Sequence, residues 1–251
     1  MKIIKNKVIT SVSKKDDDGI SLFDGDNYLI ENCIIDLSNC DLDYIDESIG
    51  VTWGSSATIK HCIIKGAGKL FLVGSGDEDK VEIESYKVVN INDCILEDFS
   101  RRGPEVQDYM IVNMNRCLIR NWGEESRFSV RSFASWSHNG GRIIASDCVY
   151  FQPYFWRGLK QMFLDFIGHF GQAFNDDGLS GILDFRTYIP GVCRALISTC
   201  YGEAKANHCG KNKWWIYIQN NKDEMSKKEV SASLIHFSEL ENDIKQKLDV
   251  E

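Results

Sequence analysis

The sequence predicts an all-β protein that folds as a parallel β-helix, a solenoid of stacked coils, with helical segments towards its C-terminus. Five cysteines recur in one context at separations of 29, 32, 23 and 31 residues, a period typical of solenoid repeats. Apolar residues three and five positions before each cysteine give the alternation of short strands with one buried face. Each repeat contains two or three short strands separated by polar bends. A single coil of this kind cannot bury its inner face alone, so the coils stack on one another.

The first strand of each repeat ends at a cysteine that aliphatic or aromatic residues follow. These cysteines are Cys33, Cys62, Cys94, Cys117 and Cys148. We expect them to form an interior ladder of reduced thiols, because free cysteine is among the most often buried residue types. Metal binding is the alternative, and the lack of any Cys-x-x-Cys pair argues against it. Further strands are predicted at 20–23, 49–52, 70–73 and 128–130.

The composition indicates how many domains the chain forms and excludes some functions. The chain has 251 residues, 43% of them apolar, and a formal net charge of −8, so we expect one main β-helical domain over residues 1–157. Residues 158–251 are expected to form a mixed helix and strand region that caps or packs on it. The acidic balance argues against non-specific nucleic-acid binding. No apolar stretch approaches about 18 residues and no signal-peptide pattern opens the chain, so we expect a soluble protein without an export signal.

The repeat also aligns charged residues outside the strands. Counting back fifteen residues from three of the cysteines reaches Asp18, Glu47 and Arg102. If the coils are in register, these side chains lie near one edge of the solenoid. Asp18 ends the acidic run 16–18, and carboxylates converging from adjacent coils can bind a hard cation. A solvated charge run at a bend is the alternative for the acidic residues.

Two adjacent arginines precede a proline in the segment 100–107. Arg101 and Arg102 form a cationic bend that suits an acidic ligand, because guanidinium groups match planar carboxylates with two parallel hydrogen bonds. A surface salt bridge from this bend to Glu105 or another neighbouring acid is the alternative.

From about residue 16 to residue 122 the chain resembles the pectate lyases of polysaccharide lyase family 1, which fold as right-handed parallel β-helices. The resemblance is carried by an ordered set of segments. They are Asp16-Asp17-Asp18-Gly19-Ile20, Asn27 to Cys33, Glu47-Ser48, Gly54-Ser55-Ser56, Lys60-His61-Cys62, Gly68-Lys69-Leu70, Val73-Gly74-Ser75 and Arg101-Arg102-Gly103-Pro104. The last segment is similar to the Arg-x-Pro turn of that family.

The resemblance implies a calcium-dependent lyase that cleaves an acidic polysaccharide by β-elimination. By position, the calcium ligands would be Asp16, Asp18 and Glu47, the catalytic base would be Arg102, and the substrate-binding residues would be Lys69, Arg101 and Gln107. Calcium would act as a Lewis acid on the uronate carboxylate. The resemblance also implies a secreted or extracellular protein.

Two positions depart from the family pattern. Val51 stands where the family has a further aspartate, and Gln107 stands where it has a second arginine. We expect weaker calcium binding from the first change and a weaker grip on a uronate carboxylate from the second. The rival function is therefore a non-catalytic β-helix that binds glycan or builds a virion or a cell surface, because the fold serves structure as readily as catalysis.

The C-terminal region shows a different periodicity. Apolar spacing predicts an amphipathic helix over residues 159–170, and extended segments are predicted at 188–193 and 213–218. Zinc binding by Cys193, Cys200, His208 and Cys209 is disfavoured by their spacing. Residues 238–241 read as a capping box that opens a short C-terminal helix, packed through Leu240, Ile244 and Leu248.

Overall fold

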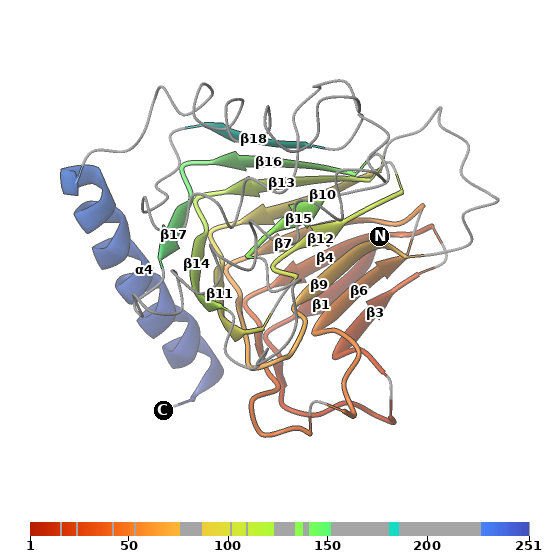
Figure 1. Ribbon diagram of the computed structural model, residues 1–251. Helices are drawn as coiled ribbons and strands as arrows, with labels where there is room; N and C mark the ends of the chain where they lie inside the picture. The colour runs from red at the N-terminus through yellow and green to blue at the C-terminus, as the bar shows by residue number, and fades with distance from the viewer. Residues whose placement is uncertain are drawn as a thin grey trace.

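The computed structural model describes residues 1–15, 17–23, 25–41, 43–52, 54–75, 87–100, 102–108, 110–122, 134–137, 141–151, 181–185 and 227–250. Eighteen strands and one helix lie in these ranges, and the strands form three parallel sheets that wind into a solenoid (Figure 1). The parallel β-helix predicted from the sequence is therefore confirmed, together with a C-terminal helix.

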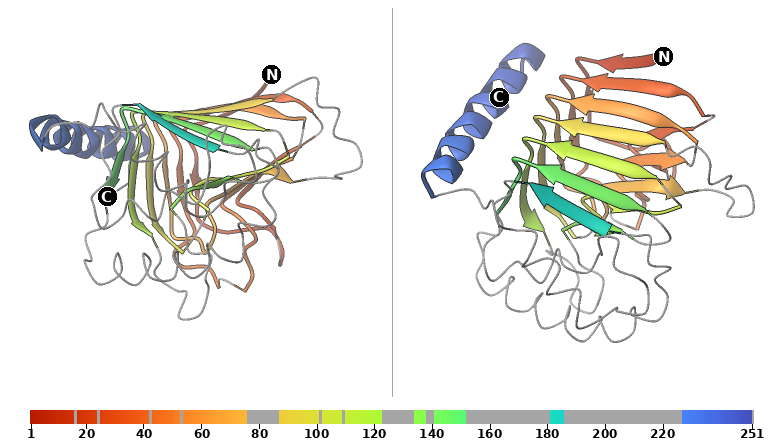
Figure 2. Two further views of the ribbon diagram at one scale, coloured as in Figure 1. Left: turned by 45° about the horizontal axis from the view of Figure 1, so that its top comes forward. Right: turned by 90° about the horizontal axis from the view of Figure 1, so that it is seen from above.

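Each sheet collects one strand from successive coils. The seven-stranded sheet contains β1 (Lys2–Lys5), β4 (Asn27–Glu31), β7 (Ser56–Lys60), β10 (Val88–Asn92), β13 (Ile111–Asn115), β16 (Arg142–Ser146) and β18 (Gly181–Phe185). The six-stranded sheet contains β2 (Val8–Ile9), β5 (Ile34–Asp36), β8 (Ile63–Lys65), β11 (Ile95–Phe99), β14 (Leu118–Trp122) and β17 (Val149–Phe151). The five-stranded sheet contains β3 (Ile20–Leu22), β6 (Ile49–Thr52), β9 (Phe71–Ser75), β12 (Glu105–Val106) and β15 (Trp136–Ser137). Figure 2 shows the strands of the seven-stranded sheet stacked along the solenoid axis.

The five repeat cysteines form the predicted interior ladder. All five side chains are fully buried and their thiols are free. Cys62 and Cys94 each donate to the carbonyl two residues earlier, at 3.2 Å, which satisfies a buried thiol at the bend between two sheets. Burial raises the pKa of the Cys94 thiol, so this ladder provides apolar packing and not reactive thiolates.

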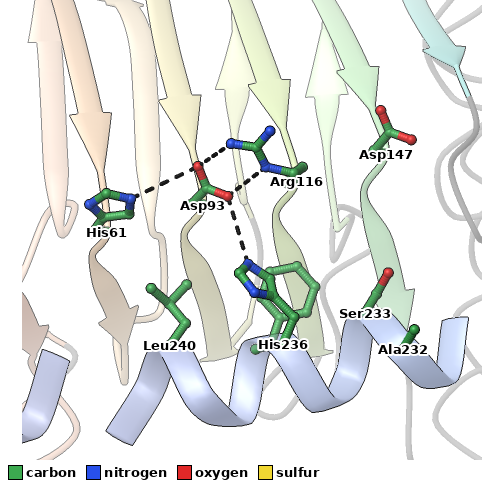
Figure 3. Close-up of a pocket in the computed structure, with 9 residues that line it drawn as sticks. His61, Asp93, Arg116, Asp147, Ala232, Ser233, His236 and Leu240 are labelled. Carbon is green, nitrogen blue, oxygen red and sulfur yellow. Dashed lines mark hydrogen bonds and ion pairs between the residues drawn. The ribbon is translucent and has the colours of Figure 1, made fainter. Parts of the chain in front are cut away.

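A residue in left-handed conformation precedes each cysteine and turns the chain from the seven-stranded sheet to the six-stranded sheet. All five have φ between 48° and 52°, and four of them, His61, Asp93, Arg116 and Asp147, lie beside the C-terminal helix. Their side chains follow one another on consecutive coils, and we call this set the corner ladder. The left-handed backbone places them outside the core, where they face the C-terminal helix (Figure 3).

Helix α4 (Lys227–Leu248) covers the outer face of the six-stranded sheet. The residue after each repeat cysteine points outwards and is aliphatic, and Ile95, Leu118 and their equivalents form an apolar stripe across the sheet. Phe237 and Ile244 of α4 are buried against this stripe. The helix thus removes from water an apolar surface that the solenoid itself leaves uncovered.

The predicted start of the C-terminal helix is wrong. The helix begins at Lys227, and Ser238 lies within it, where its hydroxyl donates to the carbonyl of Leu234 at 3.1 Å. A serine side chain within a helix can donate to the carbonyl four residues earlier. Residues 238–241 therefore match a capping box in sequence but lie in the middle of the helix. The predicted packing of Leu240, Ile244 and Leu248 is confirmed.

The described part of residues 158–251 consists of β18 and α4, and β18 extends the seven-stranded sheet beside β16. The predicted helix over 159–170, the strands at 128–130, 188–193 and 213–218, and the four residues weighed for zinc lie outside the described residues. Within the described ranges, no helix combines the length and apolarity needed to cross a membrane.

Candidate functional site

Charged residues from four consecutive coils meet at the bend that leads into the five-stranded sheet. They are Asp18, Glu47, Lys69 and Arg102. Backbone hydrogen bonds hold these bends in register, since Gly19 donates to the Glu47 carbonyl and Ser48 donates to the Lys69 carbonyl, both at 3.0 Å. The alignment expected from the cysteine spacing is therefore present, and Lys69 joins it.

Glu47 is the centre of this cluster. Its side chain is only 2% exposed, and one of its oxygens, Oε1, contacts both Arg102 Nη1 and Lys69 Nζ, the latter at 3.4 Å. Lys69 also pairs with Asp46, which is half-exposed. The carboxylate of Glu47 is thus neutralised by cations from the two following coils.

Arg102 is paired with two carboxylates. Besides Glu47, its Nε lies 2.5 Å from Oε2 of Glu105, whose side chain is 5% exposed. The backbone of Arg102 has φ of 63°, a left-handed conformation that is uncommon for a residue other than glycine, and its carbonyl accepts a 2.8 Å hydrogen bond from Phe71. The two ion pairs hold the guanidinium in place, because opposite charges at short range attract each other strongly where water is excluded.

An acidic cluster adjoins this ion-pair network. Carboxylate oxygens of Asp18, Asp46 and Glu47 lie within 4.8 Å of one another. Asp18 Oδ1 accepts the backbone N–H of Glu47 at 3.1 Å and its Oδ2 accepts the hydroxyl of Ser21 at 3.0 Å, so its position is fixed by the neighbouring coil.

Gly50 of β6 makes room for the Asp18 carboxylate. A Cβ at position 50 would lie 2.0 Å from Asp18 Oδ2, well inside van der Waals contact. Glycine within a strand marks a close approach of this kind. Any larger residue at position 50 would push the Asp18 carboxylate away from Glu47.

The carboxyl groups differ in their protonation. Burial raises the pKa of Glu47 to about 7, although Lys69 and Arg102 act in the opposite direction. Burial also raises the pKa of Asp18. For Asp46, burial acts to raise the pKa, but the contacts with Lys69 and Glu47 together outweigh it and lower the pKa. A cation bound near Asp18 and Glu47 would favour their ionised forms, because it would compensate the negative charges that burial disfavours.

The residues predicted from the sequence are brought together in part. Asp18, Glu47, Lys69 and Arg102 form the cluster, whereas Asp16 and Arg101 lie outside the described residues. Gln107 follows β12, where its backbone N–H donates to the Val73 carbonyl at 2.9 Å. Val51 is fully buried in the core, so an aspartate could not simply replace it there.

Three residues of the site were not predicted as functional. Asp46 directly precedes Glu47 and supplies the third carboxylate, Glu105 holds Arg102, and Gly50 accommodates Asp18. The glycine between Ile49 and Val51 is a signal that sequence reading could have used. The salt bridge between the arginine bend and Glu105, which the sequence analysis gave as an alternative, is present between Arg102 and Glu105. It is not a surface pair as expected, because the Glu105 side chain is buried.

The three carboxylates of this cluster are ligands of the type that calcium takes. Calcium takes carboxylate oxygens at about 2.3 to 2.6 Å, and oxygens within 4.8 Å of one another can surround such an ion. Lys69 now neutralises Asp46 and Glu47, so it would have to yield some of that contact to the ion.

Comparison with known proteins finds no matching family model and no curated protein of significant similarity.

Proposed function

We propose that the protein acts on an acidic glycan as a calcium-dependent polysaccharide lyase, with Glu47, Lys69 and Arg102 at the centre of its site. The observation that carries the proposal is the meeting of these residues on consecutive coils, in the order that the resemblance to pectate lyases implies. Each coil contributes one charged side chain to this edge of the solenoid. Such a row suits a linear polyuronate, because the polymer carries a carboxylate on each sugar.

The charge of the site supports the involvement of a divalent cation. When ionised, Asp18, Asp46, Glu47 and Glu105 outnumber Lys69 and Arg102 and leave a formal charge of −2. A polyuronate would be repelled by that charge, and a divalent cation would cancel it.

In the proposed reaction, Asp18, Asp46 and Glu47 would hold calcium, with Asp16 as a further predicted ligand. When bound, calcium supplies a positive charge that polarises the uronate carboxylate. Lys69, together with Arg101 and Gln107, holds the substrate anion. The base takes the proton from C5, and the electron pair of that C–H bond forms the double bond between C4 and C5. The bond between C4 and the glycosidic oxygen breaks with its electrons on the oxygen, which takes a proton from water.

Arg102 serves as that base only if both of its carboxylate partners, Glu47 and Glu105, release it. A guanidinium is ordinarily always protonated, and each of these carboxylates favours the protonated form. Transfer of the Glu47 carboxylate from Arg102 to the cation is therefore only one part of the rearrangement that the lyase proposal requires.

The two carboxylate partners of Arg102 also favour a second candidate, a non-catalytic β-helix that binds acidic glycan by charge. In that case the same residues bind the polymer, and no proton is transferred. The buried Val51 and the uncharged Gln107 agree with this candidate.

Incubation with polygalacturonate and other polyuronates, with calcium or with a chelator, distinguishes the two functions. A lyase gives an ultraviolet absorbance from the unsaturated product that requires calcium and is lost in Arg102→Ala. Binding of the polymer in affinity electrophoresis without such absorbance supports the second candidate. Absence of both turnover and binding on every polyuronate overturns the proposal.

A further inference from the structure

A cavity of about 540 Å³ lies between the corner ladder and helix α4, at a different bend of the solenoid from the charged edge. Cavities that hold small molecules in proteins usually measure about 300 to 1,000 Å³. The corner ladder forms the polar wall of this cavity. Helix α4 contributes the opposite wall, with Ala232, Ser233, His236, Phe237 and Leu240 (Figure 3). The proposed reaction uses none of these residues.

Asp93 is the buried carboxylate of this cavity. Its side chain is only 11% exposed, and its two oxygens accept hydrogen bonds from Nε and Nη2 of Arg116, both at 2.7 Å. Burial acts to raise the pKa of Asp93, but Arg116 and the two histidines His61 and His236 together lower it. Asp93 is therefore ionised, and the two-fold contact with Arg116 cancels its charge within the protein.

This pair leaves hydrogen-bond donors over for a ligand. Nη1 of Arg116 has no hydrogen-bond partner among the described residues, and the side chain is 57% exposed. Nε2 of His61 and Nε2 of His236 lie 4.0 and 3.8 Å from the Asp93 oxygens, beyond hydrogen-bond distance, so neither ring is committed to that acid. Ser233 adds a hydroxyl from α4.

The charge of the cavity depends on its two imidazoles. With neutral histidines, Arg116 against Asp93 and Asp147 leaves a formal charge of −1, and with both histidines protonated the formal charge is +1. Histidine takes up a proton between about pH 8 and pH 5, and a bound anion would favour the protonated rings. The polar wall thus suits an oxyanion, and the apolar side chains of α4 suit the rest of a small organic molecule.

We propose that this cavity is a binding site for a small molecule that carries an oxyanion, either a carboxylate or a tetrahedral sulfate or phosphate group, with Arg116, His61 and His236 as the donors to it. Asp93 holds the guanidinium and is not itself a ligand. Since α4 supplies His236, the site is complete only when the helix is docked on the solenoid.

Nuclear magnetic resonance of the histidine rings tests the proposal at constant ionic strength. The probes are sulfate, a tetrahedral oxyanion, and D-galacturonate, a sugar carboxylate. D-galactose is the matched control, because it has the same ring without the carboxylate. We expect saturable shifts of the His61 and His236 signals with at least one of the two anions and none with galactose. The more tightly bound anion identifies the class of oxyanion, and the absence of saturable shifts with both overturns the proposal.

Variants locate the binding. His236→Gln should weaken the anion at least about fivefold, measured at the His61 signal, because one of three charged donors is lost. Lys247→Gln is the control on the same helix, since Lys247 pairs with Asp243 outside the cavity, and it should leave the affinity unchanged. Lys69→Gln should also leave it unchanged, which separates this site from the charged edge and from the proposed lyase activity. Equal affinity in the wild type and His236→Gln contradicts the assignment.

The affinity should also depend on pH. We expect either anion to bind about tenfold more tightly at about pH 5.5 than at about pH 8, because the protonated imidazoles attract it. The charged groups that face the imidazoles are Asp93, Asp147 and Arg116, and side chains of these types titrate outside this range. Sulfate and galacturonate keep their charge over the same range. An affinity that is equal at the two pH values overturns the role of the histidines.

Discussion

Replacing Arg102 with alanine should destabilise the protein far more than replacing an exposed cation. The change removes the guanidinium that Glu47 and Glu105 share, and the side chains of these acids are only 2% and 5% exposed. Breaking a buried ion pair by removing one partner costs about 3 to 5 kcal/mol, because a charge is left buried without compensation. Lys69 still lies 3.4 Å from Glu47, so we expect the lower end, about 3 kcal/mol.

Urea unfolding followed by circular dichroism measures this loss directly at a pH above about 7, where Glu47 is ionised. For a chain of this size it corresponds to a fall in Tm of roughly 6 to 12 °C. Lys247→Ala is the control, because Lys247 and Asp243 form an exposed pair on α4, and its loss should cost no more than about 0.5 kcal/mol. The double variant Arg102→Ala with Glu105→Gln should recover part of the loss.

A result in which Arg102→Ala and Lys247→Ala lose similar free energy would refute the reasoning. It would mean that water or another group compensates the two acids. Because activity assays of Arg102→Ala presuppose a folded protein, this measurement also decides how a loss of lyase activity is interpreted.

Two further predictions concern the protonation of the site and the packing of the helix. The pKa of Glu47 is raised from its ordinary value of 4.5 to about 7, so between these values the folded state binds a proton that the unfolded state releases. The free energy of unfolding should therefore fall by up to roughly 3 kcal/mol as pH rises from about 4.5 to 7. Glu47→Gln should flatten this part of the pH profile. An equally steep profile in the variant would contradict the assignment of this pH dependence to Glu47. Phe237→Ala should weaken the docking of α4 by about 3 kcal/mol, since Phe237 is 2% exposed, and Ile235→Ala, at 62% exposed, by less than about 0.5 kcal/mol. Hydrogen exchange of the α4 amides measures both, and equal protection in the two variants would show that the apolar stripe does not hold the helix.

The sequence was sufficient to predict the solenoid and its interior. The spacing of the cysteines and the alternation before them predict where each strand lies and which face it buries, because a repeat that stacks on itself must repeat its inner residues. The same spacing placed Asp18, Glu47 and Arg102 on one edge. The apolar residue after each cysteine also signalled a covered outer face, a signal that the sequence reading did not use.

The beginning of α4 shows why local patterns fail at boundaries. Residues 238–241 match a helix start, yet the buried Val230 and the partly buried Leu234 extend the helix by packing on the six-stranded sheet. Tertiary burial thus overrode a local capping signal, which contributes only about 1 kcal/mol.

By itself, the sequence determined a parallel β-helix with a buried cysteine ladder and a charged edge, since these follow from a period and from the hydrophobicity of its positions. Only the tertiary structure decided how the charges on that edge pair. Glu47 lies 55 residues from Arg102 and 22 from Lys69, and the lengths of the intervening loops place all three within contact distance on stacked coils. The strength of an ion pair depends on the distance between the charges and on the exclusion of water, and neither can be deduced from the spacing of residues along the chain.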